Sequence, residues 1–181
     1  MNLEEKTLSQ EYKFKGNIIN MRVDSVQIPD GNIATREVIE HRGGVCIVPL
    51  TDDNEIIYVK QFRYPYKEVV IEIPAGKRDG NEAPLDCGIR ELKEETGYSA
   101  KEFIFLGELY PSPGYCGEII YMYLAKGLVA GDTDPDDDEF LEISKMTVDE
   151  FTDKILCGEI KDAKTQTAVL KTAILLKNGK M

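Results

Sequence analysis

The sequence predicts an α+β fold, in which strands and helices are mixed without regular alternation. Short strand-like segments separated by turn residues fill most of the chain, and three segments carry helix start and stop signals. The sequence shows no regular succession of βαβ units and no internal repeat. With 181 residues, the chain is large enough for one domain with a substantial core and an N-terminal extension.

An antiparallel β extension is predicted at the N-terminus. Residues 17–27 alternate between apolar and polar side chains, which predicts a strand. Pro29-Asp30-Gly31 predicts a turn, and residues 33–40 are expected to form a second strand that pairs with the first. We therefore expect residues 1–42 to form an extension that is either an accessory layer or a dimerisation element. Residues 43–181 are expected to form the main domain.

The main domain contains several predicted strands and two helices near its end. The strands are expected at residues 45–50, 55–62, 103–109, 119–125 and 140–146. Thr147 and Glu150 have the spacing of a capping box, which predicts a helix to about Leu156. Asp162 is expected to cap a last helix that runs to about Lys177.

A third helix is predicted in the middle of the chain. Either Asn81 or Asp79 is expected to cap its start, and Pro84 is tolerated in its first turn. Gly97 is suited to end the helix in a left-handed conformation. Its apolar residues share one arc that we expect to pack on the core, namely Leu85, Ile89 and Leu92.

The same helix concentrates negative charge. Glu91, Glu94 and Glu95 fall within an arc of about 100°. Like charges at these spacings cost a few tenths of a kcal/mol each, and only Arg90 offers local relief. The ordinary alternative is a solvated acidic face. We expect a metal site instead, because a hard cation such as Mg²⁺ binds carboxylate oxygens and shared phosphates.

Composition limits the partners and the compartment. A net charge of −11 argues against nucleic acid or an anionic membrane as a partner. No apolar run approaches the roughly 18 residues of a membrane span, and the polar start predicts no signal peptide. The four cysteines are scattered, which favours reduced thiols and a cytoplasmic location. His41 is the only histidine, and we favour a structural role for it.

The spacing of the middle segment resembles the Nudix box, G-x5-E-x7-R-E-U-x-E-E-x-G-U, where U is a bulky apolar residue. The positions in register are Gly76, Glu82, Arg90, Glu91, Leu92, Glu94, Glu95 and Gly97. Tyr98 fills the last U position with an aromatic residue, which is a mild departure. The resemblance implies a Nudix fold, with a mixed β-sheet sandwiched between helices.

The flanking segments resemble the ADP-ribose pyrophosphatase branch of this superfamily. Ser112-Pro113-Gly114 places a proline sixteen residues beyond Gly97, as that branch does. Further similar segments are residues 61–65, 72–77, 136–142 and 162–165. The resemblance implies metal-dependent hydrolysis of the pyrophosphate bond of ADP-ribose to AMP and ribose 5-phosphate. Hydrolases of nucleotide sugars or of other nucleoside diphosphate derivatives are the nearest alternatives, and a non-catalytic nucleotide sensor is a third.

Metal binding is assigned to the acidic helix. We expect Glu91, Glu94 and Glu95 to bind Mg²⁺, with Mn²⁺ or another divalent cation as the alternative. The resemblance adds the carbonyl of Ala75 as a further ligand. Glu94 and Glu95 are therefore also assigned to catalysis.

The remaining box residues are expected to shape the site. Glu82 and Arg90, with Gly76 and Gly97, are assigned to holding the box in shape.

By resemblance, the general base lies outside the box, and the candidates are Glu139 and Asp137. A solvated turn is the alternative for these two residues.

Cationic residues are the expected substrate contacts. Arg36, Arg63 and Lys77 are candidates for phosphate binding, although surface ion pairs are the commoner role. Pro113 and Gly114 are assigned to the substrate pocket. The resemblance also implies a homodimer in which the N-terminal extension contributes across a two-fold axis.

Overall fold

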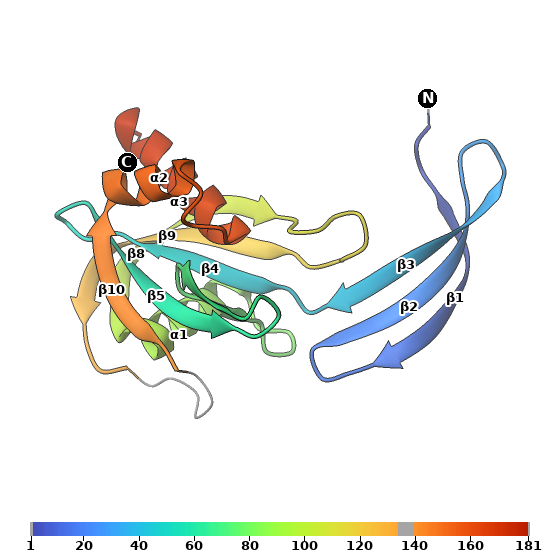
Figure 1. Ribbon diagram of the computed structural model, residues 1–181, viewed down its shortest axis with the longest axis horizontal. Helices are drawn as coiled ribbons and strands as arrows, with labels where there is room; N and C mark the ends of the chain where they lie inside the picture. Colours follow the sequence, from blue (N-terminus) through green and yellow to red (C-terminus); the bar gives the residue numbers. More distant parts are fainter. Residues whose placement is uncertain (1, 134–139, 181) are drawn as a thin grey trace. The chain divides into compact units, whose positions relative to one another are not determined.

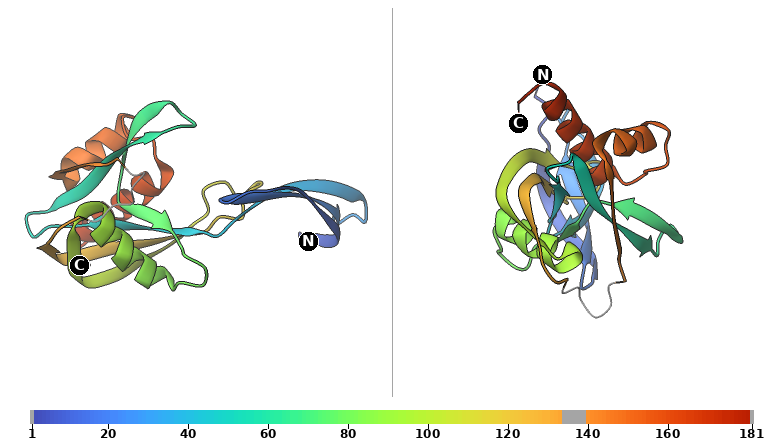
Figure 2. Two further views of the ribbon diagram at one scale, coloured as in Figure 1. Left: turned by 90° about the horizontal axis from the view of Figure 1, so that it is seen from below. Right: turned by 90° about the vertical axis from the view of Figure 1, so that its left-hand side faces the viewer.

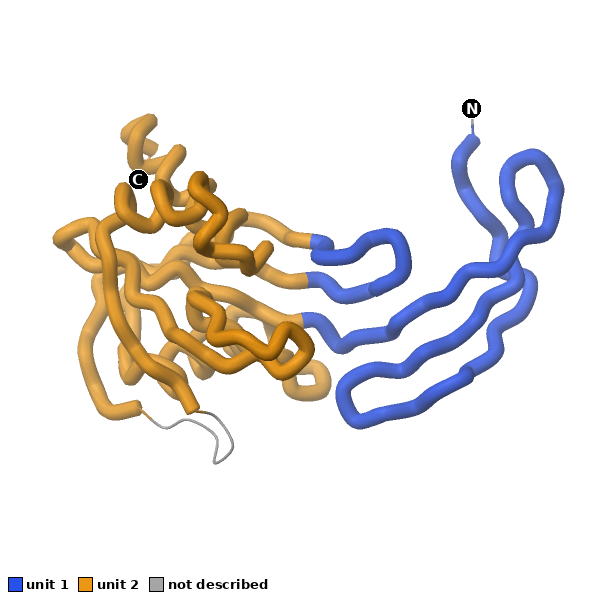
Figure 3. The backbone as a smooth tube through the Cα atoms, in the orientation of Figure 1, with its two compact units in different colours: residues 1–43, 110–119 blue, residues 44–109, 120–181 orange. Residues whose placement is uncertain are grey.

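The computed structural model describes residues 2–133 and 140–180 of the chain (Figure 1). The chain divides into two compact units, which Figure 3 shows in different colours. Unit 1 comprises residues 1–43 and 110–119, and unit 2 comprises residues 44–109 and 120–181. Strands and helices are mixed along the chain, so the α+β class is confirmed.

Unit 1 contains a three-stranded antiparallel sheet in the order β1-β2-β3. Its strands are β1 (Lys6–Lys15), β2 (Ile19–Gln27) and β3 (Ile33–His41). Strands β2 and β3 are the predicted hairpin, and they pair without interruption from Ile19–His41 to Gln27–Ile33. Strand β1 was not expected from the sequence. All ten of its residues are exposed, so no burial pattern distinguishes it.

The loop of residues 110–119 belongs to unit 1 because it is hydrogen-bonded to β3. The amide of Ile39 donates to the carbonyl of Tyr115 at 2.7 Å, and the amide of Gly117 donates to the carbonyl of Ile39 at 2.9 Å. The amide of Cys116 donates to the carbonyl of Ser112 at 2.9 Å, which closes the turn that contains Pro113. The proline turn is thus held against the end of β3.

Unit 2 contains two sheets. The first has the order β7-β4-β9-β8 and the second the order β10-β5-β6. Strand β4 pairs parallel to β9 and antiparallel to β7, so the first sheet is mixed. The strands are β4 (Gly44–Pro49), β5 (Glu55–Arg63), β6 (Glu68–Glu72), β7 (Ala75–Lys77), β8 (Tyr98–Leu109), β9 (Ile120–Ala130) and β10 (Glu142–Thr147). The short strands β6 and β7 were not expected.

The four-stranded sheet of unit 2 lies between helices. These helices are α1 (Pro84–Thr96), α2 (Val148–Leu156) and α3 (Ala163–Lys177). Successive side chains of β4 point to opposite faces: Val45 packs in a cluster with Leu92 of α1, whereas Cys46 packs in a cluster with Val169 of α3. Figure 2 shows α1 and α3 on either side of this sheet. The predicted sandwich of a mixed sheet between helices is confirmed.

The face by which α1 packs differs from the prediction. Leu92 is fully buried, but Leu85 is 38% exposed and Ile89 is 44% exposed. A Cβ on Gly88 would lie 3.1 Å from a methyl group of Val45, so the helix contacts β4 through this small residue. The close approach at Gly88 buries the neighbouring arc, which includes Glu91. Of the predicted apolar arc, Leu92 faces the core as expected, whereas Leu85 and Ile89 do not.

The start of α1 also differs from the prediction. Its N-cap is Ala83, without a side-chain hydrogen bond, so neither Asn81 nor Asp79 caps the helix. Pro84 occupies the first turn and Gly97 has a left-handed φ of 75°, as expected.

The two helices near the end of the chain follow the predicted signals. Thr147 and Glu150 form both hydrogen bonds of the capping box of α2. The Asp162 carboxylate accepts a hydrogen bond from the amide of Thr165 at the start of α3. Among the described residues, no helix is long and apolar enough to cross a membrane.

Candidate active site

The candidate site is built around α1 and the turn that leads from β7 into it. Gly76 of β7 lies directly against the carboxylate of Glu91, and a Cβ at residue 76 would lie 1.8 Å from the Cδ atom of Glu91. Only glycine leaves room for this contact. Glu91 is 8% exposed, so its charge is held at the junction between the strand and the helix.

Arg90 connects three carboxylates of the box. Its Nη1 atom lies 2.8 Å from Oε1 of Glu91 and 2.8 Å from Oε2 of Glu94. Its Nε and Nη2 atoms donate to Glu82 at 3.2 and 3.1 Å. The pKa of Arg90 is raised, chiefly by its hydrogen bond to Glu82. Arg90 thus offsets the repulsion that the sequence pattern predicts among the glutamates.

Glu82 ties the turn before α1 to the helix. Besides Arg90, its carboxylate accepts a hydrogen bond from the amide of Asp79, and its carbonyl accepts two from Arg78 at 2.9 and 2.6 Å. The hydrogen bond from Arg90 lowers the pKa of Glu82 to about 2. This arrangement supports the proposed shape-holding role of Glu82 and Arg90.

Replacement of Glu82 by glutamine is expected to make stability less dependent on acid pH. Because the folded-state pKa lies below the ordinary 4.5, the ionised carboxylate stabilises the fold above pH 4.5, and this contribution disappears as the pH falls towards 2. We expect Glu82→Gln to lower the free energy of unfolding by about 1–2 kcal/mol at pH 7 and by progressively less below pH 4.5. Urea unfolding at several pH values measures this, with Glu102→Gln as the exposed control. A difference that is constant between pH 7 and pH 3 would contradict the prediction.

Glu95 contacts the segment that precedes the helix. It is 5% exposed, and its Oε2 atom accepts a hydrogen bond from the amide of Ala75 at 3.1 Å. Ala75 and Gly76 are therefore brought to Glu95 and Glu91 by the pairing of β7 with β4 and the packing of α1 on β4, and Glu94 joins them through Arg90.

The donor set at this site fits a hard divalent cation. It consists of the carboxylate oxygens of Glu91, Glu94 and Glu95, and carboxylates are ligands that Mg²⁺ prefers. Among residues 2–133 and 140–180, no three acidic, thiol or imidazole side chains converge as a ready-made metal cage. Mg²⁺ does not require such a cage, since it commonly keeps several waters and uses one or two carboxylates together with substrate phosphates.

The predicted phosphate-binding residues are divided between the two units. In unit 2, Arg63 ends β5 and forms a two-pronged ion pair with Glu72 at 2.6 and 2.7 Å. Lys77 is exposed at the end of β7, and its carbonyl accepts a hydrogen bond from Arg90. In unit 1, Arg36 lies on β3 and pairs with Glu5.

The other predicted contacts fall elsewhere. Pro113 and Gly114 lie in the turn of unit 1 that is bonded to β3. Asp137 and Glu139, the candidates for the general base, lie outside the described residues.

A groove of about 480 Å³ adjoins Glu95 in unit 2. Phe62, Val69 and Phe140 supply apolar surface to it, and Lys60 supplies a positive charge; the remaining lining residues are Thr133, Leu141, Glu142 and Ile143. Phe62 is an exposed aromatic residue of β5, and Phe140, Leu141 and Glu142 fall in the segment 136–142 that resembles the ADP-ribose pyrophosphatase branch. The lining residues of β5, β6 and β10 gather because these three strands pair in one sheet.

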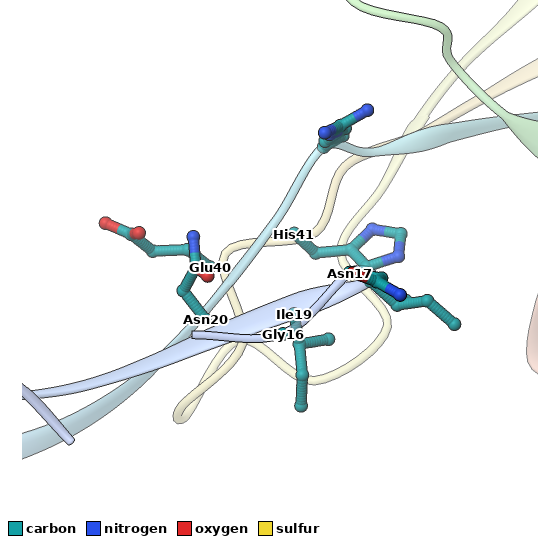
Figure 4. Close-up of a pocket in the computed structure, with 8 residues that line it drawn as sticks. Gly16, Asn17, Ile19, Asn20, Glu40 and His41 are labelled. Atoms are coloured by element: carbon teal, nitrogen blue, oxygen red, sulfur yellow. The ribbon is translucent and has the colours of Figure 1, made fainter. Parts of the chain in front are cut away.

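A smaller cavity of about 130 Å³ lies in unit 1 and contains His41 (Figure 4). The Nδ1 atom of His41 accepts a hydrogen bond from the amide of Gly43 and lies 3.3 Å from Oε1 of Glu118. The cavity includes no residue that the sequence assigns to catalysis or binding. These contacts are consistent with a structural role for His41.

Comparisons with known proteins support one family. A model described as the NUDIX domain matches residues 40–167, and a model described as the nucleoside diphosphate sugar hydrolase N-terminal domain matches residues 5–39. The chain is 40% identical over 169 residues to the ADP-ribose pyrophosphatase of Bacillus subtilis (strain 168), covering 92% of this chain and 91% of the relative. It is 39% identical over 168 residues to the methanol dehydrogenase activator of Bacillus methanolicus, with the same coverage.

The fold also has a counterpart among solved structures. A crystal structure of an ADP compounds hydrolase superposes with a TM-score of 0.86 at 20% identity, covering 99% of this chain and 98% of that one. At 20% sequence identity, this match is evidence for the fold alone. The family model spans most of the chain and includes every residue of the glutamate-rich box, and so this protein belongs to the Nudix hydrolase family.

Proposed function

We propose that this Nudix hydrolase cleaves the pyrophosphate bond of ADP-ribose, giving AMP and ribose 5-phosphate, in a reaction that depends on Mg²⁺. The observation that carries the proposal is the position of the three glutamates: Glu91 lies against Gly76, Glu95 binds the amide of Ala75, and Glu94 is joined to Glu91 through Arg90. The similarity to an ADP-ribose pyrophosphatase over most of the chain favours this substrate.

The reaction requires water to attack one phosphorus atom of the diphosphate. A new P–O bond forms to the water oxygen, the bond from that phosphorus to the bridging oxygen breaks, and the bridging oxygen leaves with the other phosphate. The water proton passes to a base, for which Glu139 and Asp137 remain the candidates. A bound Mg²⁺ ion would supply charge neutralisation at the phosphate oxygens.

The residues of the chain have separate roles in this proposal. Glu91, Glu94 and Glu95 would hold the metal ion, while Glu82 and Arg90 keep the box in shape. Arg63 and Lys77 offer positive charge to the diphosphate, which a protein with a net charge of −11 otherwise repels. The groove beside Glu95, with Phe62 at its wall, offers apolar surface for a nucleoside.

A nucleotide sugar is the alternative substrate. The match of residues 5–39 to the N-terminal domain of nucleoside diphosphate sugar hydrolases favours it. Both substrate classes contain a diphosphate that links two groups, so the same carboxylates and cations would serve either reaction.

We also propose that the protein is a cytoplasmic homodimer. Strand β1 exposes all of its residues, including Tyr12 and Phe14, and a second copy of the chain would cover such a surface. Sedimentation equilibrium of the purified chain measures the state, and a monomer at micromolar concentration would refute the dimer.

The proposal is tested with a panel of diphosphates in the presence of Mg²⁺. The panel contains ADP-ribose, GDP-mannose, UDP-glucose, a dinucleoside polyphosphate and an oxidised nucleotide, with products separated by chromatography. We expect equal amounts of AMP and ribose 5-phosphate from ADP-ribose, a kcat/KM at least about tenfold above the other substrates, and no turnover in excess chelator. A clear preference for a sugar nucleotide would assign the alternative function, and full activity in chelator would refute the role of the metal.

A further inference from the structure

The first turn of α3 places a lysine in the interior of unit 2. Lys164 is the second residue of this helix, and its side chain is 11% exposed. Its ammonium group binds the carboxylate of Glu72 and lies 3.1 Å from Oδ1 of Asp162. A lysine is rarely buried unless it is paired, so the position of Lys164 requires a partner that remains charged.

Glu72 is that partner, and it lies between two cations. Its side chain is 3% exposed, and its Oε2 atom accepts hydrogen bonds from both Lys164 and Nη2 of Arg63. Burial by itself raises the pKa of Glu72, but the hydrogen bonds and charges of Arg63 and Lys164 outweigh it and hold the pKa below its ordinary value. Glu72 therefore stays ionised and is held in place by the two cations.

The ion pair with Glu72 leaves one edge of the Arg63 guanidinium available for another hydrogen-bond acceptor. The Nε and Nη2 atoms of Arg63 are used by Glu72, and within the described residues its Nη1 atom makes no hydrogen bond. The side chain of Arg63 is 41% exposed. Nearby charges, including that of Glu95, contribute to the raised pKa of Arg63, after the larger effect of its hydrogen bond to Glu72. The free edge thus belongs to a partly exposed guanidinium that is bound to Glu72, three residues before Ala75, and the amide of Ala75 donates to Glu95.

The same turn of α3 also holds the backbone that leads to the site. The hydroxyl of Thr165 accepts a hydrogen bond from the amide of Ile73 at 3.0 Å, and the carbonyl of Pro74 accepts one from the amide of Ile47 at 2.9 Å. The next amide, that of Ala75, donates to Glu95. An unbroken series of contacts therefore runs from α3 through residues 72–75 to α1.

We propose that Lys164 is a positioning residue, which fixes Glu72 and thereby holds the Arg63 guanidinium with its Nη1 edge towards a phosphate of the diphosphate substrate. The proposal deepens the proposed function and rests on it. Lys164 does not touch the substrate in this arrangement. Its effect on substrate binding passes through Arg63, because a two-pronged pair sets the plane of a guanidinium only while the carboxylate itself is held in place.

The test separates positioning from simple support of the helix. In the full-length protein with Mg²⁺ and ADP-ribose, we expect Lys164→Met to raise KM about tenfold, which corresponds to ~1.4 kcal/mol, and to change kcat less than about threefold. The matched control is Lys171→Met, which removes an exposed lysine of the same helix and should leave both constants unchanged. A variant that loses thermal stability or kcat at an unchanged KM would overturn the proposal.

A double-mutant cycle with Arg63→Gln identifies the route of the effect. If Lys164 acts through Arg63, adding Lys164→Met to Arg63→Gln should change KM by less than about twofold. Equal factors in the two backgrounds would show that Lys164 acts independently of Arg63, and the proposal would fail.

Three further outcomes are distinguishable. Removing one partner of a buried ion pair can prevent folding, whereas removing both is often tolerated. If Lys164→Met does not fold, the Glu72→Gln/Lys164→Met double variant replaces it, and an unchanged KM in that folded variant would overturn the proposal. If another diphosphate is hydrolysed instead of ADP-ribose, the proposed function fails and the same constants, measured with that diphosphate, still decide the role of Lys164. If no diphosphate is hydrolysed, both proposals fail.

Discussion

Replacement of Glu94 or Glu95 by glutamine is expected to reduce kcat by at least about 10²-fold, the scale on which a single preorganised electrostatic group contributes to catalysis. Each change removes one negative charge from the metal-binding carboxylates and leaves the shape of the side chain nearly unaltered. The amide oxygen of a glutamine at residue 95 can still accept the hydrogen bond from Ala75, so we expect the fold to persist. Steady-state kinetics with ADP-ribose and Mg²⁺, together with circular dichroism, measure the two effects.

The matched control for these variants is Asp86→Asn. Asp86 is an exposed carboxylate of the same helix, and it lies outside the glutamate group. We expect this variant to keep the activity of the wild-type protein. Full activity of either glutamine variant would refute the assignment of Glu94 and Glu95 to the metal.

Replacement of Gly76 by alanine is expected to reduce activity about 10²-fold, as a displacement of about 1 Å at a reacting centre can do. The new methyl group would lie 1.8 Å from the Cδ atom of Glu91, so the carboxylate must move. The displaced atoms are the end of a flexible side chain, and a strained rotamer costs only about 1 kcal/mol. Activity should therefore fall far more than the melting temperature, and kinetics and thermal unfolding together measure this.

Gly117→Ala is the control for the added methyl group. The nearest heavy atom to a Cβ at residue 117 is the carbonyl oxygen of Ile39 at 3.6 Å, which is an ordinary contact. A parallel loss of stability and activity in Gly76→Ala, without a selective loss of activity, would show that Gly76 supports the fold and not the position of Glu91.

Local signals explain the parts of the structure that could be predicted. The capping box of Thr147 and Glu150, the cap at Asp162 and the left-handed end at Gly97 involve residues within about one helical turn, so a short stretch of sequence contains the whole interaction. The β2–β3 hairpin is predictable for the same reason, since its turn and its alternation lie within one segment.

The predictions from sequence failed where tertiary packing determines the structure. All residues of strand β1 are exposed, so its sequence shows no alternation between buried apolar and exposed polar side chains that could predict a strand. The burial of Leu85 and Ile89 was predicted wrongly, because the close contact of Gly88 with Val45 turns the neighbouring arc of α1 towards the sheet, although Leu92 is buried as predicted. The ion pair of Lys164 with Glu72 joins residues 92 positions apart, and no local sequence pattern indicates that the two residues pair.

The sequence by itself determined the family, the order of the glutamates and glycines in the box, and the ends of the later helices, because each of these depends on spacing along the chain. Only the tertiary structure decided that Gly76 adjoins Glu91, that Arg90 joins three carboxylates, and that Glu72 is enclosed by Arg63 and Lys164. The physical reason is that the burial and pairing of charges depend on which distant segments the sheets and helices bring into contact.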